Sequence, residues 1–159
     1  ESIESVVSEN ERVSSSAVRR ALEAGKMKRA GELLGRPYTM NGRVVHGDGR
    51  GRKFGFATAN ILVKHASLPL QGVFAVQAST PSGKIYQGVA NLGVRPSIYS
   101  AARPVLEVHL LDFSGDIYGV HLNVAFLHKI RDEKRFSDLE SLRVQIASDV
   151  KMARDYFTC

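Results

Sequence analysis

The segment Val105-Leu106-Glu107-Val108-His109-Leu110-Leu111 sets the pattern from which the fold can be inferred. Side chains along a β-strand point alternately to its two faces, so the even-numbered residues of this segment share one apolar face. Glu107 lies on the opposite face, which turns either into a cleft or toward solvent. The alternation predicts a β-strand over Val105–Asp112 with one buried side.

Four further segments have the same strand-like character and are rich in Val, Ile, Tyr and Phe. These strands are expected at Thr39–His46, Gly72–Ser79, Lys84–Asn91 and His121–Leu127. Turn signals such as Pro81-Ser82-Gly83 separate them. Short strands that follow one another without long helices favour an antiparallel barrel or sandwich.

The N-terminal region, residues 1–35, has a helical pattern. Ser14-Ser15-Ser16 offers N-caps, and Gly25 is typical of a helix C-terminus. A second short helix is expected to end at Gly35, before Pro37. This region is too small to form a core of its own.

A longer helix is predicted near the C-terminus. Ser137 and Glu140 have the spacing of a capping box. Apolar residues then recur every three or four positions and predict a stripe packed on the barrel. The stripe comprises Leu139, Leu142, Ile146, Val150, Ala153 and Phe157. The remaining faces are expected to carry Arg143, Asp149, Lys151 and Arg154.

The composition bounds the class of protein. A chain of 159 residues with 43% apolar side chains fits one domain with a short appendage. Its net charge of +6 suggests an anionic partner, either nucleic acid or a phosphorylated small molecule. The single cysteine, Cys159, cannot form an internal disulfide, and no apolar run is long enough to span a bilayer. The acidic N-terminus does not resemble a signal peptide, so we expect a cytoplasmic protein without a membrane partner.

A glycine-rich stretch, Gly47–Asn60, lies between two apolar segments. Glycines let backbone N–H groups approach phosphates, and Arg50, Arg52 and Lys53 add positive charge. The stretch matches neither the Walker pattern nor the dinucleotide fingerprint. Its composition alone leaves two interpretations open, a nucleotide-phosphate loop or a basic hairpin connection.

Glu107 is the acidic residue of greatest interest, as either a surface carboxylate or a general base that takes a proton from a hydroxyl. The five histidines do not lie at metal-site spacing, which argues against structural zinc. The segment Asn91–Ser97 is interpreted as an ordinary turn, and Lys129–Phe136 as a solvated charged connection.

Taken in order, the segments of residues 36–157 resemble the riboflavin kinase module of bacterial bifunctional riboflavin kinase/FAD synthetases. One matching segment is Gly51-Arg52-Lys53-Phe54-Gly55-Phe56-Ala57-Thr58-Ala59-Asn60, and the ordered set of segments is more specific than any single motif. The other matching segments are Gly35–Tyr38, Gly42–Asp48, Leu68–Leu70, Gly72–Val76, Tyr86–Pro96, Leu106–Phe113, Gly115–Gly119 and Ile130–Phe136.

The resemblance implies a mainly β fold, a Greek-key antiparallel barrel of about six strands with a C-terminal helix and a short helical N-terminal segment. It also implies an Mg²⁺- and ATP-dependent kinase that phosphorylates the ribityl 5′-hydroxyl of riboflavin, with FMN and ADP as products. By the same resemblance Glu107 is the catalytic base. Thr58 would hold Mg²⁺, and Asn60 would contact metal, phosphate or flavin. The phosphate-binding loop would include Gly47, Lys53 and Gly55, and the flavin-side loop Arg131.

The resemblance also divides the chain. Residues 1–35 are similar to the end of an adenylyltransferase module, and residues 36–159 to the kinase domain. The rest of the first module would be the partner within the full-length protein, so FAD synthesis is not expected from this sequence. If residues 1–35 are such a remnant, Leu22, Leu33 and Leu34 are expected to lack packing partners.

One position departs from the family signature, because Ala57 stands where the family has proline. Proline would restrict the backbone, so we expect a less preorganised loop with the chemistry retained. Two other functions compete with the kinase: a small basic barrel that binds nucleic acid, and a flavin carrier that binds without catalysis.

Overall fold

The computed structural model describes residues 7–8, 11–12, 15–45, 58–63, 68–95, 103–115 and 117–158. Three helices and eight strands are assigned within these ranges. The helices are α1 (Ser15–Glu23), α2 (Met27–Leu34) and α3 (Leu139–Thr158). The strands are β1 (Val7–Ser8), β2 (Glu11–Arg12), β3 (Tyr38–Val45), β4 (Thr58–Ile61), β5 (Gly72–Ser79), β6 (Ile85–Arg95), β7 (Arg103–Leu110) and β8 (His121–Arg131).

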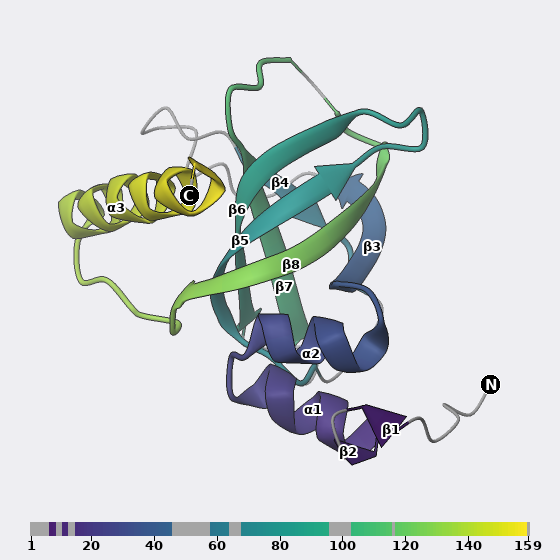
Figure 1. The fold of residues 1–159 in the computed structure, drawn as a ribbon. Helices are drawn as coiled ribbons and strands as arrows, with labels where there is room; N and C mark the ends of the chain where they lie inside the picture. Colours follow the sequence, from purple (N-terminus) through teal and green to yellow (C-terminus); the bar gives the residue numbers. More distant parts are fainter. Residues whose placement is uncertain are drawn as a thin grey trace.

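Six strands close into an antiparallel barrel in the order β3-β4-β7-β6-β5-β8, as Figure 1 shows. β5, β6 and β7 pair in sequence, and β8 returns to lie beside β5, which is a Greek-key arrangement. The predicted fold class is therefore confirmed. β4 was not among the expected strands, and β6 continues to Arg95, through residues that we expected to form a turn.

The barrel interior is filled by the inward-facing residues of all six strands. Leu106 and Val108 of β7 are fully buried, as the alternation predicts. At the centre, the rings of Phe74 and Phe126 meet edge to face, with their centroids 5.2 Å apart. Such a pair adds about 0.5–1.5 kcal/mol to the stabilisation from burial of the two rings.

The two N-terminal helices lie at one end of the barrel, below it in Figure 1. α2 contacts β3 and β8, and Leu22 and Leu33 are buried in the same cluster as the barrel core. The expectation that these leucines lack partners is therefore wrong. α1 is followed by Gly25 and α2 by Gly35, both with left-handed backbone, as predicted. The region is not wholly helical, because β1 and β2 form a short ladder before α1.

α3 packs beside the barrel against β5, β6 and β8. Its N-cap is Asp138, whose Oδ1 accepts a hydrogen bond from the Ser141 backbone N–H at 2.7 Å, and not the predicted Ser137. Ala153, Val150 and Phe157 pack on the barrel, as the stripe predicts. Leu139 is exposed, although the stripe predicts that it packs on the barrel.

The polar face of α3 is not exposed throughout, since Asp149 is buried with only 3% of its surface exposed. The sequence assigned it to the solvent side because of its charge. The helix instead turns this carboxylate toward a partner on the barrel. None of the described helices is long and apolar enough to cross a membrane.

Candidate active site

A row of polar side chains crosses three neighbouring strands on the outer face of the barrel. Asn60 of β4 lies directly opposite Glu107 of β7, and Glu107 lies directly opposite Asn91 of β6. Residues opposite one another in an antiparallel pair point to the same face, with Cβ atoms about 4.5–5.5 Å apart. The sequence neighbours of Glu107 face the core, so these three side chains face outward. We call Asn60, Glu107 and Asn91 the polar row.

Thr58 lies two residues before Asn60 on β4 and is opposite His109 of β7. Because side chains two residues apart in a strand share a face, Thr58 is on the same side of the sheet as the polar row. All of these residues are half-buried. The hydroxyl, amide and carboxylate are thus held by hydrogen-bonded strands within one small area of the barrel wall.

The row continues under α3. Asn91 is opposite Val73 of β5, and Val73 is opposite Arg131 of β8. Val73 belongs to the apolar cluster formed by the barrel wall and Ala153 of α3. Successive cross-strand partners therefore form one register line from the half-buried polar row to Arg131, on the side of the barrel that α3 covers.

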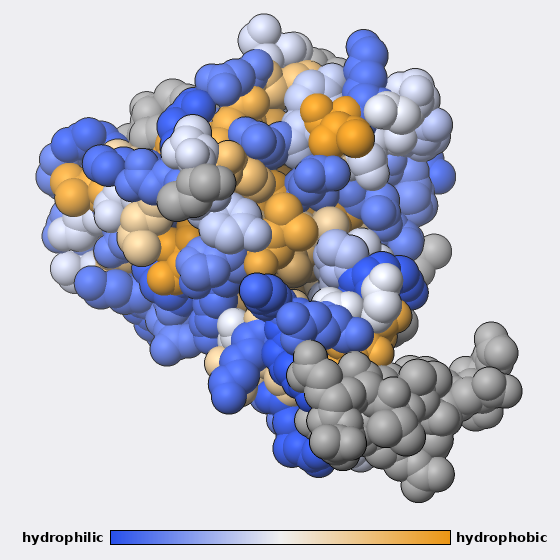
Figure 2. All heavy atoms as spheres, in the orientation of Figure 1, coloured by the Kyte–Doolittle hydropathy of each residue, from blue (hydrophilic) through white to orange (hydrophobic). Residues whose placement is uncertain are grey.

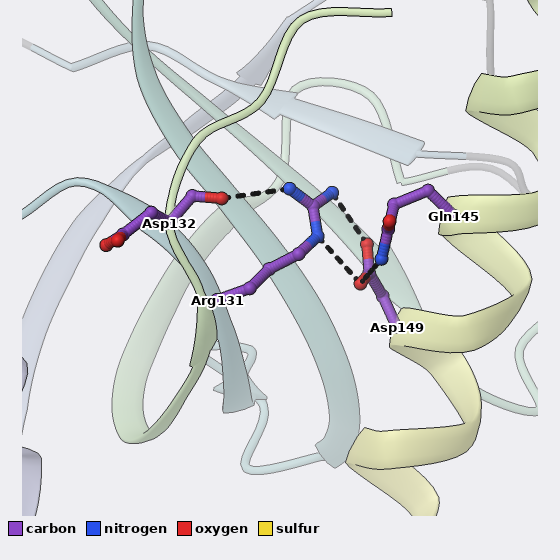
Figure 3. A network of polar contacts seen from close by, with 4 residues as sticks. All are labelled: Arg131, Asp132, Gln145 and Asp149. Atoms are coloured by element: carbon purple, nitrogen blue, oxygen red, sulfur yellow. Dashed lines mark hydrogen bonds and ion pairs between the residues drawn. The ribbon is translucent and has the colours of Figure 1, made fainter.

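Arg131 is fixed to α3 through Asp149, as Figure 3 shows. Its Nε and Nη2 each donate to one carboxylate oxygen of Asp149 at 2.9 Å, and its Nη1 donates to the backbone carbonyl of Asp132 at 2.9 Å. Gln145 donates a further hydrogen bond to Asp149 at 3.0 Å. Three of the five guanidinium N–H groups are thereby used within the protein. The arrangement is rigid, because a bidentate pair fixes both distance and orientation.

Glu133 follows β8 and brings a second carboxylate toward the polar row. A Cβ on Gly93 would lie 2.5 Å from its Oε2, so the carboxylate occupies the space that the missing side chain leaves. Burial raises the pKa of Glu133, the Arg131 charge lowers it, and the negative charge of Glu107 raises it further. Most of the Glu133 residue is exposed to solvent. Its carboxylate is the part that loses water, because it lies against the barrel wall over Gly93.

Asn91 has an unsatisfied polar atom. Its Oδ1 is buried, and no described residue donates a hydrogen bond to it. A buried acceptor without a donor costs about 1–3 kcal/mol, so such atoms are uncommon outside sites that bind something. Within the described residues, the polar row therefore contains an acceptor that still needs a donor.

The structure brings together three of the predicted site residues, Thr58, Asn60 and Glu107. Arg131 lies at the other end of the same register line. Gly47, Lys53 and Gly55 of the expected phosphate loop lie outside the described residues, as does Ala57.

Asn91, Glu133 and Asp149 were not predicted as site residues. Asn91 was predicted to end the strand Lys84–Asn91 and begin the turn Asn91–Ser97, and Glu133 was assigned to a solvated connection, both from local composition. The register of β6 with β7 could have placed Asn91 beside Glu107. The other two depend on contacts between segments far apart in the sequence.

The described residues contain no cluster of three or more His, Cys, Asp or Glu side chains that could hold a metal ion. Thr58 and Asn60 nevertheless offer hard oxygen donors on one strand. Mg²⁺ prefers oxygen ligands and keeps several waters, and it often relies on substrate phosphates for the rest. These donors fit a magnesium ion shared with a nucleotide better than a cage made of protein alone.

Described residues line a smaller and a larger groove. The smaller, about 410 Å³, lies between the segment before α3 and the first turns of that helix, and Phe136, Val144 and Gln145 contribute to its lining. The larger, about 970 Å³, lies between α2 and β8, next to Lys26 and Arg29. Figure 2 shows hydrophilic residues over the α2 side of this region. The larger groove is not at the polar row, whereas Gln145 links the smaller one to the Arg131–Asp149 pair.

Comparison with known proteins gives a consistent result. A family model described as "Flavokinase: Riboflavin kinase" matches residues 34–157. A bifunctional riboflavin kinase/FMN adenylyltransferase from Haemophilus influenzae is 47% identical over 147 residues, covering 92% of this chain and 47% of the relative. The chain spans about half the length of the curated relatives it matches.

Two solved structures are similar in fold. A riboflavin kinase from Trypanosoma brucei has a TM-score of 0.54 and 26% identity, covering 77% of this chain and 78% of that one. A macrolide-efflux protein from Streptococcus pneumoniae has a TM-score of 0.83 and 33% identity, covering 96% of this chain and 50% of that one. The second likeness extends over the N-terminal helices as well as the barrel.

Proposed function

Because the chain belongs to the riboflavin kinase family, we propose that it transfers the γ-phosphate of ATP to the 5′-hydroxyl of riboflavin, giving FMN and ADP. The observation that carries this proposal is the pairing of Glu107 with Asn60 across β7 and β4. A half-buried carboxylate held beside a fixed amide, on a rigid sheet, suits a reaction that depends on positioning.

Glu107 is the general base of the proposed reaction. It accepts the proton of the 5′-hydroxyl as that oxygen forms its bond to the γ-phosphorus, while the bond to the bridging oxygen of ADP breaks. The strand pairing on both sides of β7 holds the Glu107 backbone in place. The carboxylate therefore needs little reorganisation when the hydroxyl arrives.

Thr58 and Asn60 act on the phosphate side of the reaction. The Thr58 hydroxyl would hold Mg²⁺ together with phosphate oxygens, and Asn60 would orient the phosphate or the hydroxyl next to Glu107. When bound, Mg²⁺ neutralises charge that develops on the phosphate oxygens. The phosphate-loop roles of Gly47, Lys53 and Gly55 are part of the same proposal and rest on the family resemblance.

Arg131 and α3 form the flavin side. Asp149 fixes the guanidinium, whose carbon lies 5.8 Å from the centre of the Phe136 ring. Phe136 also lines the smaller groove, which offers an aromatic surface for the planar ring of the flavin. On this proposal the substrate lies with its ring toward α3 and its 5′-hydroxyl toward Glu107.

The proposal also covers the cellular compartment of the reaction and the use of its product. ATP is plentiful in the cytoplasm, which is where we place the activity. The curated relatives are named for an FMN adenylyltransferase activity as well, so FMN made here would be the substrate of that second activity in a longer protein.

The test incubates the purified chain with riboflavin, ATP and Mg²⁺ and separates the flavins by chromatography. We expect FMN to form, and Glu107→Gln to lower kcat by about 10²–10⁴-fold. Glu32→Gln on the exposed side of α2 is the matched control and should keep full activity. Flavin binding without turnover would indicate a carrier instead. Salt-dependent oligonucleotide binding without turnover would indicate a nucleic-acid-binding barrel, and either result would overturn the kinase assignment.

A further inference from the structure

None of the described residues donates a hydrogen bond to the buried Oδ1 of Asn91. Its cross-strand neighbours are Glu107 on one side and Val73 on the other. An ionised carboxylate only accepts hydrogen bonds, and a valine side chain offers none. Glu133, whose carboxylate covers Gly93 two residues along β6, is a third neighbour without a donor when ionised.

A shared metal ion does not account for this acceptor. Asn91 is on β6 and Thr58 is on β4, and β7 lies between them. Neighbouring strands are about 4.7–4.9 Å apart, so the two backbones are separated by about twice that distance. Thr58 is also displaced by two residues along β4 from the position opposite Glu107, so the two short side chains start too far apart to converge easily on one Mg²⁺, which binds its ligands at about 2.0–2.1 Å. A group bound beside Glu107 is the candidate donor for Asn91 Oδ1, since no described residue supplies one.

We propose that Asn91 Oδ1 accepts a hydrogen bond from the hydroxyl next to the one that is phosphorylated, and so selects substrates that carry a vicinal diol. This inference rests on the proposed kinase reaction. Glu107 and Asn91 are immediate cross-strand neighbours, as the two hydroxyls are immediate neighbours on the sugar-alcohol chain. One side chain takes the reacting hydroxyl and the other holds the hydroxyl beside it.

The consequence is specificity for the sugar-alcohol chain. A site built to hydrogen-bond a substrate hydroxyl discriminates strongly against an analogue that lacks it, because the buried protein group is then left unpaired. A flavin with a terminal hydroxyl but no hydroxyl at the adjacent carbon should still reach Glu107. It should be a poor substrate because Asn91 remains unsatisfied and the chain is free to rotate.

The experiment is a two-by-two comparison of kcat/KM. Wild type and Asn91→Ala are each assayed with riboflavin and with 4′-deoxyriboflavin, which lacks only the neighbouring hydroxyl. We expect the wild type to lose about 10–100-fold on the deoxy analogue. Asn91→Ala should show a similar loss on riboflavin and little further loss on the analogue, with the KM for ATP unchanged.

The control is Asn41→Ala, which removes an exposed asparagine from the outer face of β3 and should behave as wild type. Independent, additive losses would overturn the inference, as would a rise in the KM for ATP or full activity in Asn91→Ala. If the alanine variant does not fold, as judged by its melting curve, Asn91→Ser is assayed against the same criteria. A wild type that forms no FMN from riboflavin would reject the proposed function itself, which separates the two failures.

Discussion

The two faces of the β6–β7–β4 sheet differ in polarity, although both are formed by alternating residues of the same three strands. On the inner face, Leu106 and Val108 are fully buried and alternate with Glu107 on the outer face. The inner face joins an apolar cluster that reaches the N-terminal helices. The outer face carries the polar row.

This difference shows how the barrel separates stability from chemistry. Burial of the inner residues supplies the free energy of folding, since each large apolar side chain contributes about 1.5–3 kcal/mol. The outer residues can then include an unsatisfied amide oxygen and two carboxylates close together, which are unfavourable in themselves. Because the side-chain period is two, one strand can serve both purposes without any change of backbone.

The sharpest test of this separation compares adjacent residues of β7. Leu106→Ala should lower the free energy of unfolding by about 2–5 kcal/mol, because it leaves a cavity in the core. For a chain of this size each kcal/mol lowers Tm by about 2–4 °C. Glu107→Gln should abolish most activity and leave Tm within a few degrees of wild type. Thermal melting and kcat measured on both variants would decide the point, and a large loss of stability in Glu107→Gln would contradict it.

The outer face is itself divided, because the end under α3 contains a mostly buried ion pair between Arg131 and Asp149 that also stabilises the fold. Asp149→Asn should cost about 3 kcal/mol of stability, since it leaves the Arg131 guanidinium mostly buried without its ionised partner. Denaturant unfolding would measure this effect.

The matched control for that variant is Asp155→Asn on the same helix. Asp155 forms an exposed ion pair with Lys151 at 2.9 Å, and such pairs contribute little. Equal costs for the two variants would show that burial of the Arg131–Asp149 pair is unimportant. A loss of flavin affinity in Asp149→Asn alone would connect the pair to the proposed flavin side.

The sequence predicts most of the strands well because strand composition and alternation are local properties, whereas the choice of a closed barrel over a sandwich came from the family resemblance. β5 has the predicted bounds Gly72–Ser79, and the burial of Leu106 and exposure of Glu107 to the outer face follow from periodicity alone. β4 was missed because it is only four residues long and three of them belong to the glycine-rich stretch Gly47–Asn60, whose composition is typical of a loop. Its strand character comes from pairing with β3 and β7, which the sequence does not display.

The site is less predictable because its geometry depends on register and packing. Glu107 stood out from the alternation of its strand, but its role as the base and the roles of Asn60 and Thr58 came from resemblance to a family, and only the strand pairing places the three together. Asp149 looks like a surface residue until Arg131, 18 positions earlier, is found beside it. The unsatisfied Asn91 oxygen has no signature in sequence, since it is defined by what surrounds the atom.

The smallest expected effect concerns Glu133, whose negative charge lies near the proposed base. Removing that charge in Glu133→Gln should make it easier to keep Glu107 ionised, so the acid limb of the kcat/KM profile should move to lower pH. The stability effect has a definite sign. Because the pKa of Glu133 is raised above its ordinary value of 4.5, the folded protein holds this proton more tightly than the unfolded chain. Stability is therefore lost as pH rises through and above that value.

Glu133→Gln has no proton to lose, so it should melt slightly higher than wild type at neutral pH, and the difference should shrink in acid. Paired melting curves across pH would measure this, alongside the activity profile. The exposed Glu140, whose pKa is lowered by its hydrogen bond from Arg143, gives the opposite control: Glu140→Gln should not raise Tm at neutral pH. An unchanged acid limb in Glu133→Gln would mean that the second carboxylate of the outer face acts only on packing over Gly93. The ionisation of Glu107 would then depend on its strand neighbours and not on the charge of Glu133.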